Sequence, residues 1–348
     1  MNSKPSNFIN TTEQKIIAEI GLSHEGSVGL AITMSKSAIK AGADIIKFQA
    51  HFPSQESSEA EKFRVVFSKQ DDSRWDYWER TSFSLPQWAL IKASVEELGA
   101  EFAVSVFSAY AVESFINQSI KYLKLGSGDL TNPELMEALE NYKGIVILST
   151  GLATWNEIVD AAEWIKESNF DPASAMLQCT SLYPTPLKLV GLNVMSRIST
   201  ELDLPTGLSD HSVGISSALT ALVHGASYIE KHFVLHKSFF GPDVQSSITP
   251  DELEALCKFR DDLVDLRSEV DKDKLALTLA PTKVLFGRSL GLRKSFLKGE
   301  TPQLRDFCLR KPSGGLDWQH RQRVQGLPLV KDYSERDLLT LKHFGIEN

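Results

Sequence analysis

The stretch PTGLSDHSVGISSALTALVHGASYIEKH, residues 205–232, contains one complete strand–helix–strand unit. Two short apolar runs, 205–209 and 228–232, enclose an amphipathic segment at 215–223 that stops before Gly225. Short apolar runs bounded by glycine, proline or polar residues are typical of buried parallel strands. A glycine after the last periodic residue is a signal for the C-terminus of a helix. This unit therefore predicts a parallel α/β fold.

The same alternation extends outward in both directions along the chain. Six further apolar runs predict strands at 16–20, 44–49, 102–106, 122–125, 145–149 and 175–179. Helical patterns are found at 30–41, 86–98, from 132 onward, 154–165 and 249–266. Eight strand–helix pairs in roughly 250 residues predict a TIM (β/α)8 barrel. An open doubly wound sheet is the alternative, which the lack of a Gly-x-Gly-x-x-Gly turn after the first strand disfavours.

The composition and pattern of the sequence change after the predicted barrel. Residues 1–270 form the predicted TIM-barrel domain. Residues 271–285 are charged and then irregular, and we interpret them as a linker. Residues 286–348 combine short β-like runs with several glycines and prolines, which predicts a small β-rich C-terminal domain.

The composition of the 348-residue chain excludes several classes of protein. A hydrophobic fraction of 42% and a charged fraction of 24% are typical of a soluble globular protein. The formal net charge of −8 argues against nucleic-acid binding, which needs a basic surface. Three cysteines without a C-x-x-C spacing indicate neither a disulfide framework nor a zinc site. We expect a cytoplasmic protein without a membrane partner, because no secretory signal or membrane-spanning apolar run is found.

Polar residues interrupt or end most of the predicted strands. The active site of a TIM barrel lies at the C-terminal ends of its strands, so we expect these side chains to converge on one site. They are Glu19, Lys47, Gln49, Ser105, Lys124, Ser127, Ser149, Ser209, Asp210, His211, Glu230 and His232.

Two lysines lie inside predicted strands, where a charge is costly unless it is paired. Lys47 and Lys124 could pair with barrel glutamates such as Glu19 or Glu230. Alternatively, with nearby serines, they could form a cradle for a phosphate and a carboxylate. The turns at 126–128 and 149–151 contain glycine and serine and offer free backbone N–H groups to an anion.

Two histidines end adjacent predicted strands. His211 and His232 could bind one divalent cation and leave positions open for water and substrate, with Glu19 and Asp243 available nearby. Two imidazoles with little carboxylate suit Mn²⁺ or a similar ion. A purely structural role for each histidine is the alternative.

The remaining reactive side chains give weaker indications. We interpret the other histidines as loop or surface residues, although His24 and His51 could line the site. Cys179 ends a strand, and we interpret it as a small buried residue and not as a nucleophile. The sequence contains neither a serine nucleophile elbow nor a P-loop.

A series of motifs spans nearly the whole chain. These motifs are Ala18-Glu19-Ile20-Gly21-x-x-His24-Glu25-Gly26, Gly42-Ala43-Asp44, Lys47-Phe48-Gln49, Lys124-x-Gly126-Ser127-Gly128-Asp129, Leu148-Ser149-Thr150-Gly151, Cys179-Thr180-Ser181-x-Tyr183-Pro184, Gly207-Leu208-Ser209-Asp210-His211, Glu230-Lys231-His232-Phe233 and Gly241-Pro242-Asp243. In this order and spacing they resemble the sialic acid (N-acetylneuraminate) synthases and related nonulosonic acid synthases. Residues 286–290 and 298–300 resemble the start of that family's C-terminal antifreeze-like (SAF) domain.

The resemblance implies a TIM barrel followed by an SAF domain. It implies a metal-dependent transferase that condenses phosphoenolpyruvate with N-acetylmannosamine or a relative, giving a nonulosonic acid and phosphate. The implied cofactor is a divalent metal, for which the two histidines favour Mn²⁺, with Mg²⁺ or Co²⁺ as alternatives. It also implies a domain-swapped homodimer in which the SAF domain of one chain caps the barrel of the other.

The resemblance also assigns roles by position. The implied catalytic residues are Glu19, His211, His232 and Asp243, of which His211 and His232 hold the metal. The implied phosphoenolpyruvate site consists of Lys47, Ser105, Lys124, Ser127, Ser149, Tyr183 and Ser209. The implied residues facing the sugar are Gln49, Asp129 and Asp243.

The sequence departs from the family pattern at several positions. Ser23 stands where Asn is usual, and Ser105-Val106 stands for Thr-Pro. Residues 310–314 replace the usual Lys-Arg-Pro-Gly, whose arginine reaches into the partner's site to hold the acylamino group. Either Arg310 or Lys311 could take that position, and lysine is not an equivalent planar fork.

These departures leave the acceptor sugar open. A legionaminic- or pseudaminic-type acid, or another ulosonic acid, is the alternative product. Residues 52–81, with Trp75, Tyr77 and Trp78, either shape a different sugar pocket or pack as an ordinary loop. A non-catalytic homologue that binds metal or sugar is a further alternative. A metal-dependent hydrolase is disfavoured because two histidines supply too few ligands.

Overall fold

The computed structural model describes residues 14–67 and 70–347. Contacts divide the chain into two compact units, of which the first ends at Arg267 and the second begins at Ser268. None of the helices in the described residues combines the length and the apolar character that crossing a bilayer requires.

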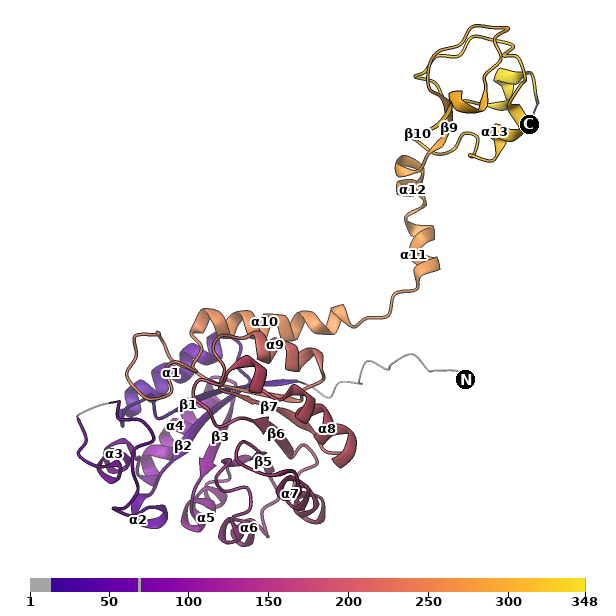
Figure 1. Cartoon of the computed structure of the whole chain (residues 1–348). Coiled ribbons are helices and arrows are strands. Elements are labelled where there is room, and N and C mark those ends of the chain that lie inside the picture. The colour runs from indigo at the N-terminus through magenta and orange to yellow at the C-terminus, as the bar shows by residue number, and fades with distance from the viewer. Residues whose placement is uncertain (1–13, 68–69, 348) are drawn as a thin grey trace. The chain divides into compact units, whose positions relative to one another are not determined.

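Eight parallel strands close into a barrel in the first unit (Figure 1). The strands are β1 (Lys15–Gly21), β2 (Ile45–Ala50), β3 (Glu101–Val106), β4 (Tyr122–Leu125), β5 (Ile145–Ser149), β6 (Ala175–Cys179), β7 (Thr206–Asp210) and β8 (Tyr228–His232). Each strand pairs with the next in sequence, and β1 pairs with β8. The predicted TIM barrel is confirmed, and the open doubly wound sheet is excluded because the sheet closes on itself.

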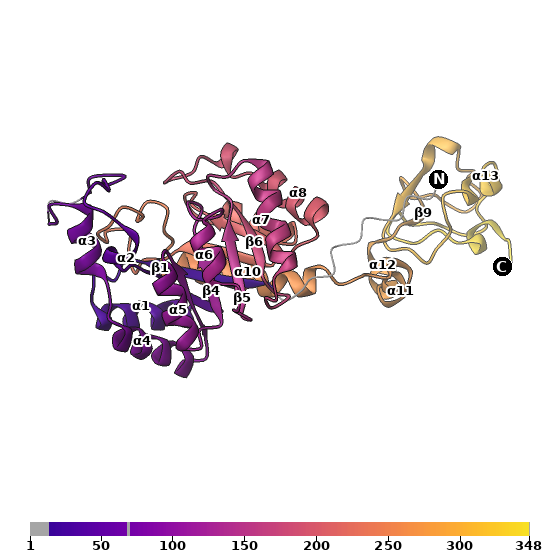
Figure 2. The same ribbon diagram turned by 90° about the horizontal axis from the view of Figure 1, so that it is seen from below.

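Helices surround these strands in both views (Figures 1 and 2). They are α1 (Val28–Lys40), α2 (Pro53–Glu56), α3 (Arg74–Thr81), α4 (Leu85–Glu97), α5 (Ala109–Asn117), α6 (Pro133–Ala138), α7 (Trp155–Glu167), α8 (Leu192–Leu202), α9 (Ser216–Val223) and α10 (Pro250–Leu266), with a short 3₁₀ turn at Leu187–Leu189.

The start signals in the sequence account for most of these helices. Thr154 and Glu157 form the predicted capping box of α7, in which each side chain accepts a hydrogen bond from the other residue's backbone N–H. The pattern does not predict α5, although Ser108 caps it by accepting from Ala111 N. It also misses α8, which follows Gly191. This glycine has a φ of 77° and no side chain with which to cap the helix.

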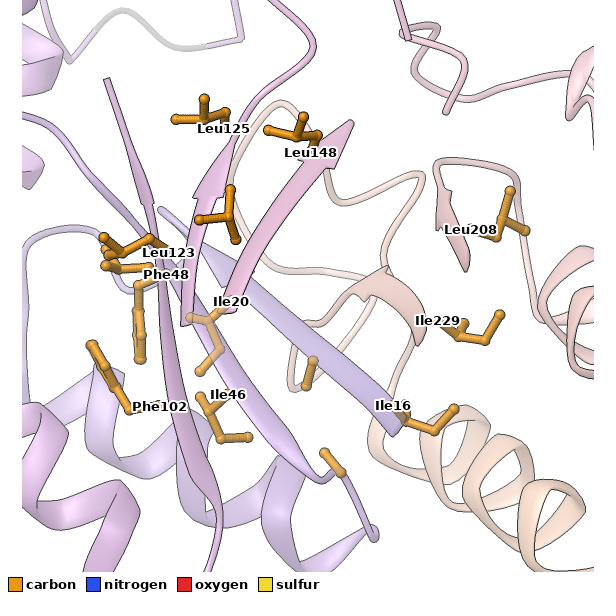
Figure 3. Packing of buried hydrophobic residues seen from close by; sticks show 14 of the residues in the cluster. Ile16, Ile20, Ile46, Phe48, Phe102, Leu123, Leu125, Leu148, Leu208 and Ile229 are labelled. Atoms are coloured by element: carbon orange, nitrogen blue, oxygen red, sulfur yellow. The ribbon is translucent and has the colours of Figure 1, made fainter. Parts of the chain in front are cut away.

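Side chains along each strand alternate between two environments. The outward-facing side chains pack against the helices and form the main core (Figure 3), and they include Ile16, Ile20, Ile46, Phe48, Phe102, Leu123, Leu125, Leu148, Leu208 and Ile229. A separate apolar cluster is formed by alternate residues nearer the N-terminal ends, namely Ile17, Ile45, Ala103, Tyr122, Ile145, Ile147, Ala175, Leu177 and Tyr228. In most strands, the next inward-facing residue after this cluster is polar. The interior of the barrel therefore changes from apolar to polar toward the C-terminal ends of the strands.

The second unit has its own small core. It contains α11 (Lys272–Thr278), α12 (Ala280–Phe286), β9 (Ser289–Leu292), β10 (Phe307–Arg310), α13 (His320–Val324) and 3₁₀ turns at Leu304–Asp306 and Leu341–Phe344. β9 and β10 form an antiparallel pair, and their buried residues pack with Phe296 and Tyr333.

The segment predicted to be irregular, 271–285, instead carries most of two short helices. α11 forms because the side chain of Asp271 accepts hydrogen bonds from two backbone N–H groups in its first turn. α12 has Pro281 in its first turn, where proline is well tolerated.

Candidate active site

The polar side chains at the C-terminal ends of the strands converge on one cavity of about 410 Å³. Predicted site residues that line it are Glu19, Lys47, Gln49, Ser105, Lys124, Ser127, Asp129, Ser149, Tyr183, Ser209, His211, Glu230 and His232. We call this space the cradle cavity. The register brings these residues to one level, because Glu19 pairs with Lys47 across β1 and β2 and Ser209 pairs with Glu230 across β7 and β8.

Other predicted site residues lie elsewhere. Asp243 lines an adjoining cavity of about 260 Å³ that shares Gln49, Tyr183 and His232 with the cradle cavity. Asp210 is directed away from the cradle cavity and is paired with Lys231, whose side chain is fully buried. Arg310 and Lys311 belong to the second unit, where they line a separate hollow. Their predicted role in a partner's site stays a prediction.

The two strand lysines are held by two glutamates at the floor of the cradle cavity. Lys47 Nζ contacts Glu19 Oε2 and lies 3.7 Å from Glu230 Oε2. Lys124 Nζ contacts Glu230 Oε1. All four side chains are at least nine-tenths buried. The two readings of these lysines are therefore compatible, since the lysines are ion-paired with glutamates and also line the cavity.

Hydroxyl and amide groups complete this network. Lys47 Nζ donates to Ser105 Oγ at 2.9 Å, and Gln49 Nε2 donates to Glu19 Oε1 at 2.8 Å. Ser209 Oγ donates to Glu230 Oε1 at 3.1 Å. Burial alone would raise the pKa of Glu230, but the charges of the two lysines outweigh it and lower that pKa to about 2. The glutamate therefore stays ionised at neutral pH.

The anion-binding turns also lie at this cavity. Ser127 Oγ accepts a hydrogen bond from Gly151 N at 2.9 Å, which ties the 126–128 turn to the 149–151 turn. Ser149 Oγ is buried and has no hydrogen-bond partner among residues 14–67 and 70–347. A buried hydroxyl without a partner is unusual in a folded protein, so Ser149 is suited to meet a bound ligand.

The two strand-end histidines face each other, with their ring centroids 5.4 Å apart. His211 Nδ1 lies 3.1 Å from the carbonyl oxygen of Thr180. A proton on Nδ1 satisfies that carbonyl and leaves the lone pair on Nε2, which is the arrangement common among metal-ligating histidines. The ring of Tyr183 stacks on His211 at 4.0 Å and fixes its orientation. Within the described residues, no group of three or more His, Cys, Asp and Glu side chains is placed to hold a metal.

Several residues that line the cavity were not predicted. His24 and His51 lie in loops, as predicted, but their side chains are buried, and His343 is buried in a 3₁₀ turn. Burial lowers the pKa of His24 to about 3, and the ring stacks on Phe83, so His24 acts as a core residue. His51 lines the cradle cavity, together with Glu61, Arg74, Trp78 and Phe107.

Described residues between positions 63 and 78 line the adjoining cavity. Arg64 Nη2 donates to Asp243 Oδ1 at 2.7 Å, although the residues are 179 positions apart. The guanidinium of Arg64 also lies 4.2 Å from the ring centroid of Tyr183. Tyr77 and Trp78 line the cavity, with Phe63 and Phe67 from the same segment.

Comparisons with known proteins agree with this geometry. The NeuB family model matches residues 34–270. An N,N'-diacetyllegionaminic acid synthase of Legionella pneumophila is 29% identical over 334 residues, which cover 94% of each chain. A pseudaminic acid synthase of Campylobacter jejuni is 30% identical over 337 residues, which cover 96% of this chain and 97% of that one.

A solved structure shows the same fold. The N-acetylneuraminic acid (sialic acid) synthetase of Leptospira borgpetersenii, in complex with citrate, superposes with a TM-score of 0.67 at 28% identity, covering 78% of this chain and 92% of that one. Since the family model covers well over half of the chain, this protein belongs to the NeuB family.

Proposed function

We propose that this protein condenses phosphoenolpyruvate with the open-chain aldehyde of an N-acylated amino sugar, giving a nonulosonic acid and phosphate. The observation that carries the proposal is the buried cradle of two lysines and several serines beside two facing histidines. Relatives that align with more than nine-tenths of the chain are named legionaminic and pseudaminic acid synthases, which supports the same reaction class.

The cradle suits the two anionic groups of phosphoenolpyruvate. Lys47 and Lys124 present two ammonium groups, while Ser149 Oγ and the backbone of the glycine–serine turns provide neutral donors. The bound substrate would present its C3 carbon to the aldehyde, an orientation effect that raises the rate. The lysines then stabilise the charge on the departing phosphate, which leaves with cleavage of its C–O bond.

A divalent metal fits the two histidines. His211 and His232 would hold it, and the Nδ1 hydrogen bond of His211 to Thr180 O leaves Nε2 free for this purpose. Because the described residues offer no third clustered ligand, water and substrate would fill the other positions. We propose Mn²⁺, with Mg²⁺ or Co²⁺ as alternatives. Such an ion supplies Lewis-acid polarisation of the aldehyde.

The adjoining cavity suits an N-acylated sugar. Its wall combines aromatic rings, including Tyr77 and Trp78, with the ion pair between Arg64 and Asp243. Aromatic rings contact acyl methyl groups, and the charged groups bind hydroxyl and amide groups. N-acetylmannosamine and its diacetamido-dideoxy relatives both carry this chemistry. Glu19, Gln49 and Asp129 would face the reacting end of the sugar.

The second unit, which begins at Ser268, is also assigned a role. We propose that it is an SAF domain that caps the barrel of a second copy in a homodimer, with Arg310 or Lys311 contacting the acylamino group. The alignment with the Legionella synthase supports this proposal, because it extends over 94% of the chain. We also propose a cytoplasmic location, where phosphoenolpyruvate is available.

The test is a reaction with purified protein, Mn²⁺, phosphoenolpyruvate and a panel of sugars. The panel contains N-acetylmannosamine, its diacetamido-dideoxy relatives and arabinose 5-phosphate. We expect phosphate release and a 2-keto acid heavier than one sugar by a pyruvate unit. His211→Ala should abolish the product, whereas His224→Ala, at an exposed position, should not. Sugar breakdown without phosphoenolpyruvate would contradict the proposal.

A further inference from the structure

The side chain of His51 is held in place on both ring faces and at one ring nitrogen. It follows directly after β2 and is 5% exposed. Its ring lies between two aromatic side chains, with Trp78 at 3.8 Å and an interplanar angle of 17° and Phe107 at 4.4 Å and 6°. Both faces of the imidazole are therefore covered, and the ring cannot turn without displacing an aromatic side chain.

One edge of the ring is occupied by a carboxylate. His51 Nδ1 lies 2.5 Å from Glu56 Oε1, and the side chain of Glu56 is 6% exposed. Glu56 Oε2 accepts a hydrogen bond from the backbone N–H of Phe52 at 3.2 Å, which fixes the carboxylate in place. A carboxylate at Nδ1 holds the proton there and leaves the lone pair on Nε2.

The other nitrogen has no protein partner. His51 Nε2 is buried and makes no hydrogen bond within residues 14–67 and 70–347. His51 nevertheless lines the cradle cavity, beside Ser105, Gly126 and Asp129. Because both ring faces and Nδ1 are taken, Nε2 is the polar atom left for a group bound in the cavity.

Three other groups of the cradle cavity are poorly suited to accept a proton. Glu230 is buried and would favour the neutral form, but its two lysines hold it ionised and make it a weak base. Glu19 is in contact with Lys47 and accepts from Gln49. Burial raises the pKa of the Cys179 thiol, which therefore stays protonated. His51 differs from these groups in having an unpartnered Nε2 lone pair and a tautomer fixed by Glu56.

We propose that His51 is the base for the water that adds to C2 of phosphoenolpyruvate, with Glu56 as its positioning residue; this inference rests on the proposed function. In this step, the water oxygen bonds to the cationic C2 left after C3 has attacked the aldehyde. One water O–H bond breaks, and its proton passes to Nε2. The imidazolium returns that proton to the bridging oxygen of phosphate as the C2–O bond breaks. The second water proton neutralises the alkoxide derived from the aldehyde, so that the product is a 2-keto acid.

The test compares His51→Ala and His51→Gln with the unchanged protein, using phosphoenolpyruvate and the panel sugar that gives most product. We expect kcat to fall by about 10²–10³-fold, as for loss of a general base, with unchanged phosphoenolpyruvate binding by calorimetry. Added imidazole should restore turnover to His51→Ala, because the substitution leaves a slot between Trp78 and Phe107. A structural role alone would not give this rescue.

Glu56→Gln tests the positioning role. It should lower kcat less than His51→Ala does, and it should have no further effect in the His51→Ala background, since residues that act as a unit are not additive. Gln55→Ala, at an exposed position of the same short helix, is the matched control and should leave kcat unchanged.

The outcomes separate this inference from the proposed function. If the unchanged protein makes no 2-keto acid from any sugar, the proposed function fails, and His51 loses the step assigned to it. If the unchanged protein turns over and His51→Ala does so equally fast, only the assignment of His51 is overturned. Lost activity that imidazole does not restore would also overturn it.

Discussion

The lower and upper halves of the barrel interior are built from the same strands but have opposite chemistry. Ile17, Ile45 and Tyr228 belong to an apolar cluster, and two residues further on stand Glu19, Lys47 and Glu230. The lower half is stabilised by burial of apolar surface. The upper half is a buried ionic network, for which hydrophobic residues would be at least as stabilising. The upper half therefore offers chemistry that an apolar interior would lack, whereas the lower half contributes stability.

The largest expected effect comes from unpairing the network. Lys124→Met leaves Glu230 without its closest cation, and breaking one side of a buried pair costs about 3–5 kcal/mol. Phosphoenolpyruvate binding should be lost at the same time. Urea unfolding and calorimetry measure the two effects, with Lys166→Met, at an exposed lysine of α7, as control.

Replacing both partners of the ion pair separates the loss of the pair from the burial of an unpaired charge. In Lys124→Met/Glu230→Met, Lys47 keeps Glu19, so the free energy of unfolding should return close to that of the unchanged protein while activity stays lost. A double variant that remains as unstable as Lys124→Met would show that the ion pair itself stabilises the barrel.

A substitution in the lower half should lower the stability of the fold without changing substrate binding. Ile147→Ala removes a fully buried side chain two residues before Ser149 and should cost about 2–5 kcal/mol, whereas Ile147→Val should cost about 0.5–1.5 kcal/mol. The KM for phosphoenolpyruvate should not change in either variant. A large change in that KM, measured well below the unfolding temperature, would contradict the separation of the two halves.

The pH dependence of stability gives a further comparison. The pKa of Glu230 is lowered in the folded chain from 4.5 to about 2, so its ionisation stabilises the fold above about pH 4.5 and this contribution is lost as the pH falls toward 2. The double methionine variant lacks this contribution. Urea unfolding between these pH values should therefore show a steeper loss of stability for the unchanged protein than for the variant.

A further effect is expected at the adjoining cavity. Arg64→Ala removes a partly exposed partner of Asp243 and should raise the KM for the sugar by about tenfold, equivalent to about 1.4 kcal/mol. The KM for phosphoenolpyruvate should be unchanged. Arg64→Lys is the matched variant, because it keeps the charge but not the planar fork. An equal change for both substrates would contradict the assignment of two separate subsites.

Sequence reasoning reached the barrel and its inner wall because both depend on periodic patterns. A strand places every second residue on the same face, so Lys47 and Gln49 could be assigned to one cavity before any coordinates were known. The local sequence does not determine the relative register of strands that are not neighbours. The contact of Lys124 with Glu230 could therefore be proposed only as one of several glutamate pairings.

The contacts that were missed lie where no period applies. The pairing of Arg64 with Asp243 depends on how two loops fold over the barrel, and loop conformation has no repeating signal. His51 comes directly after a strand, and its burial depends on Trp78 and Phe107 from other segments. The sequence signal for the pairing of His51 with Glu56 was a histidine directly after Gln49-Ala50 and a glutamate five residues later.

We propose that this cradle holds phosphoenolpyruvate for carbon–carbon bond formation with C–O cleavage. The reaction can be run in water enriched in oxygen-18, with mass spectrometry of both products. We expect a 2-keto acid heavier than the sugar by a pyruvate unit, together with phosphate that carries no label. Labelled phosphate accompanied by free pyruvate would contradict it, because that result means hydrolysis at phosphorus without condensation.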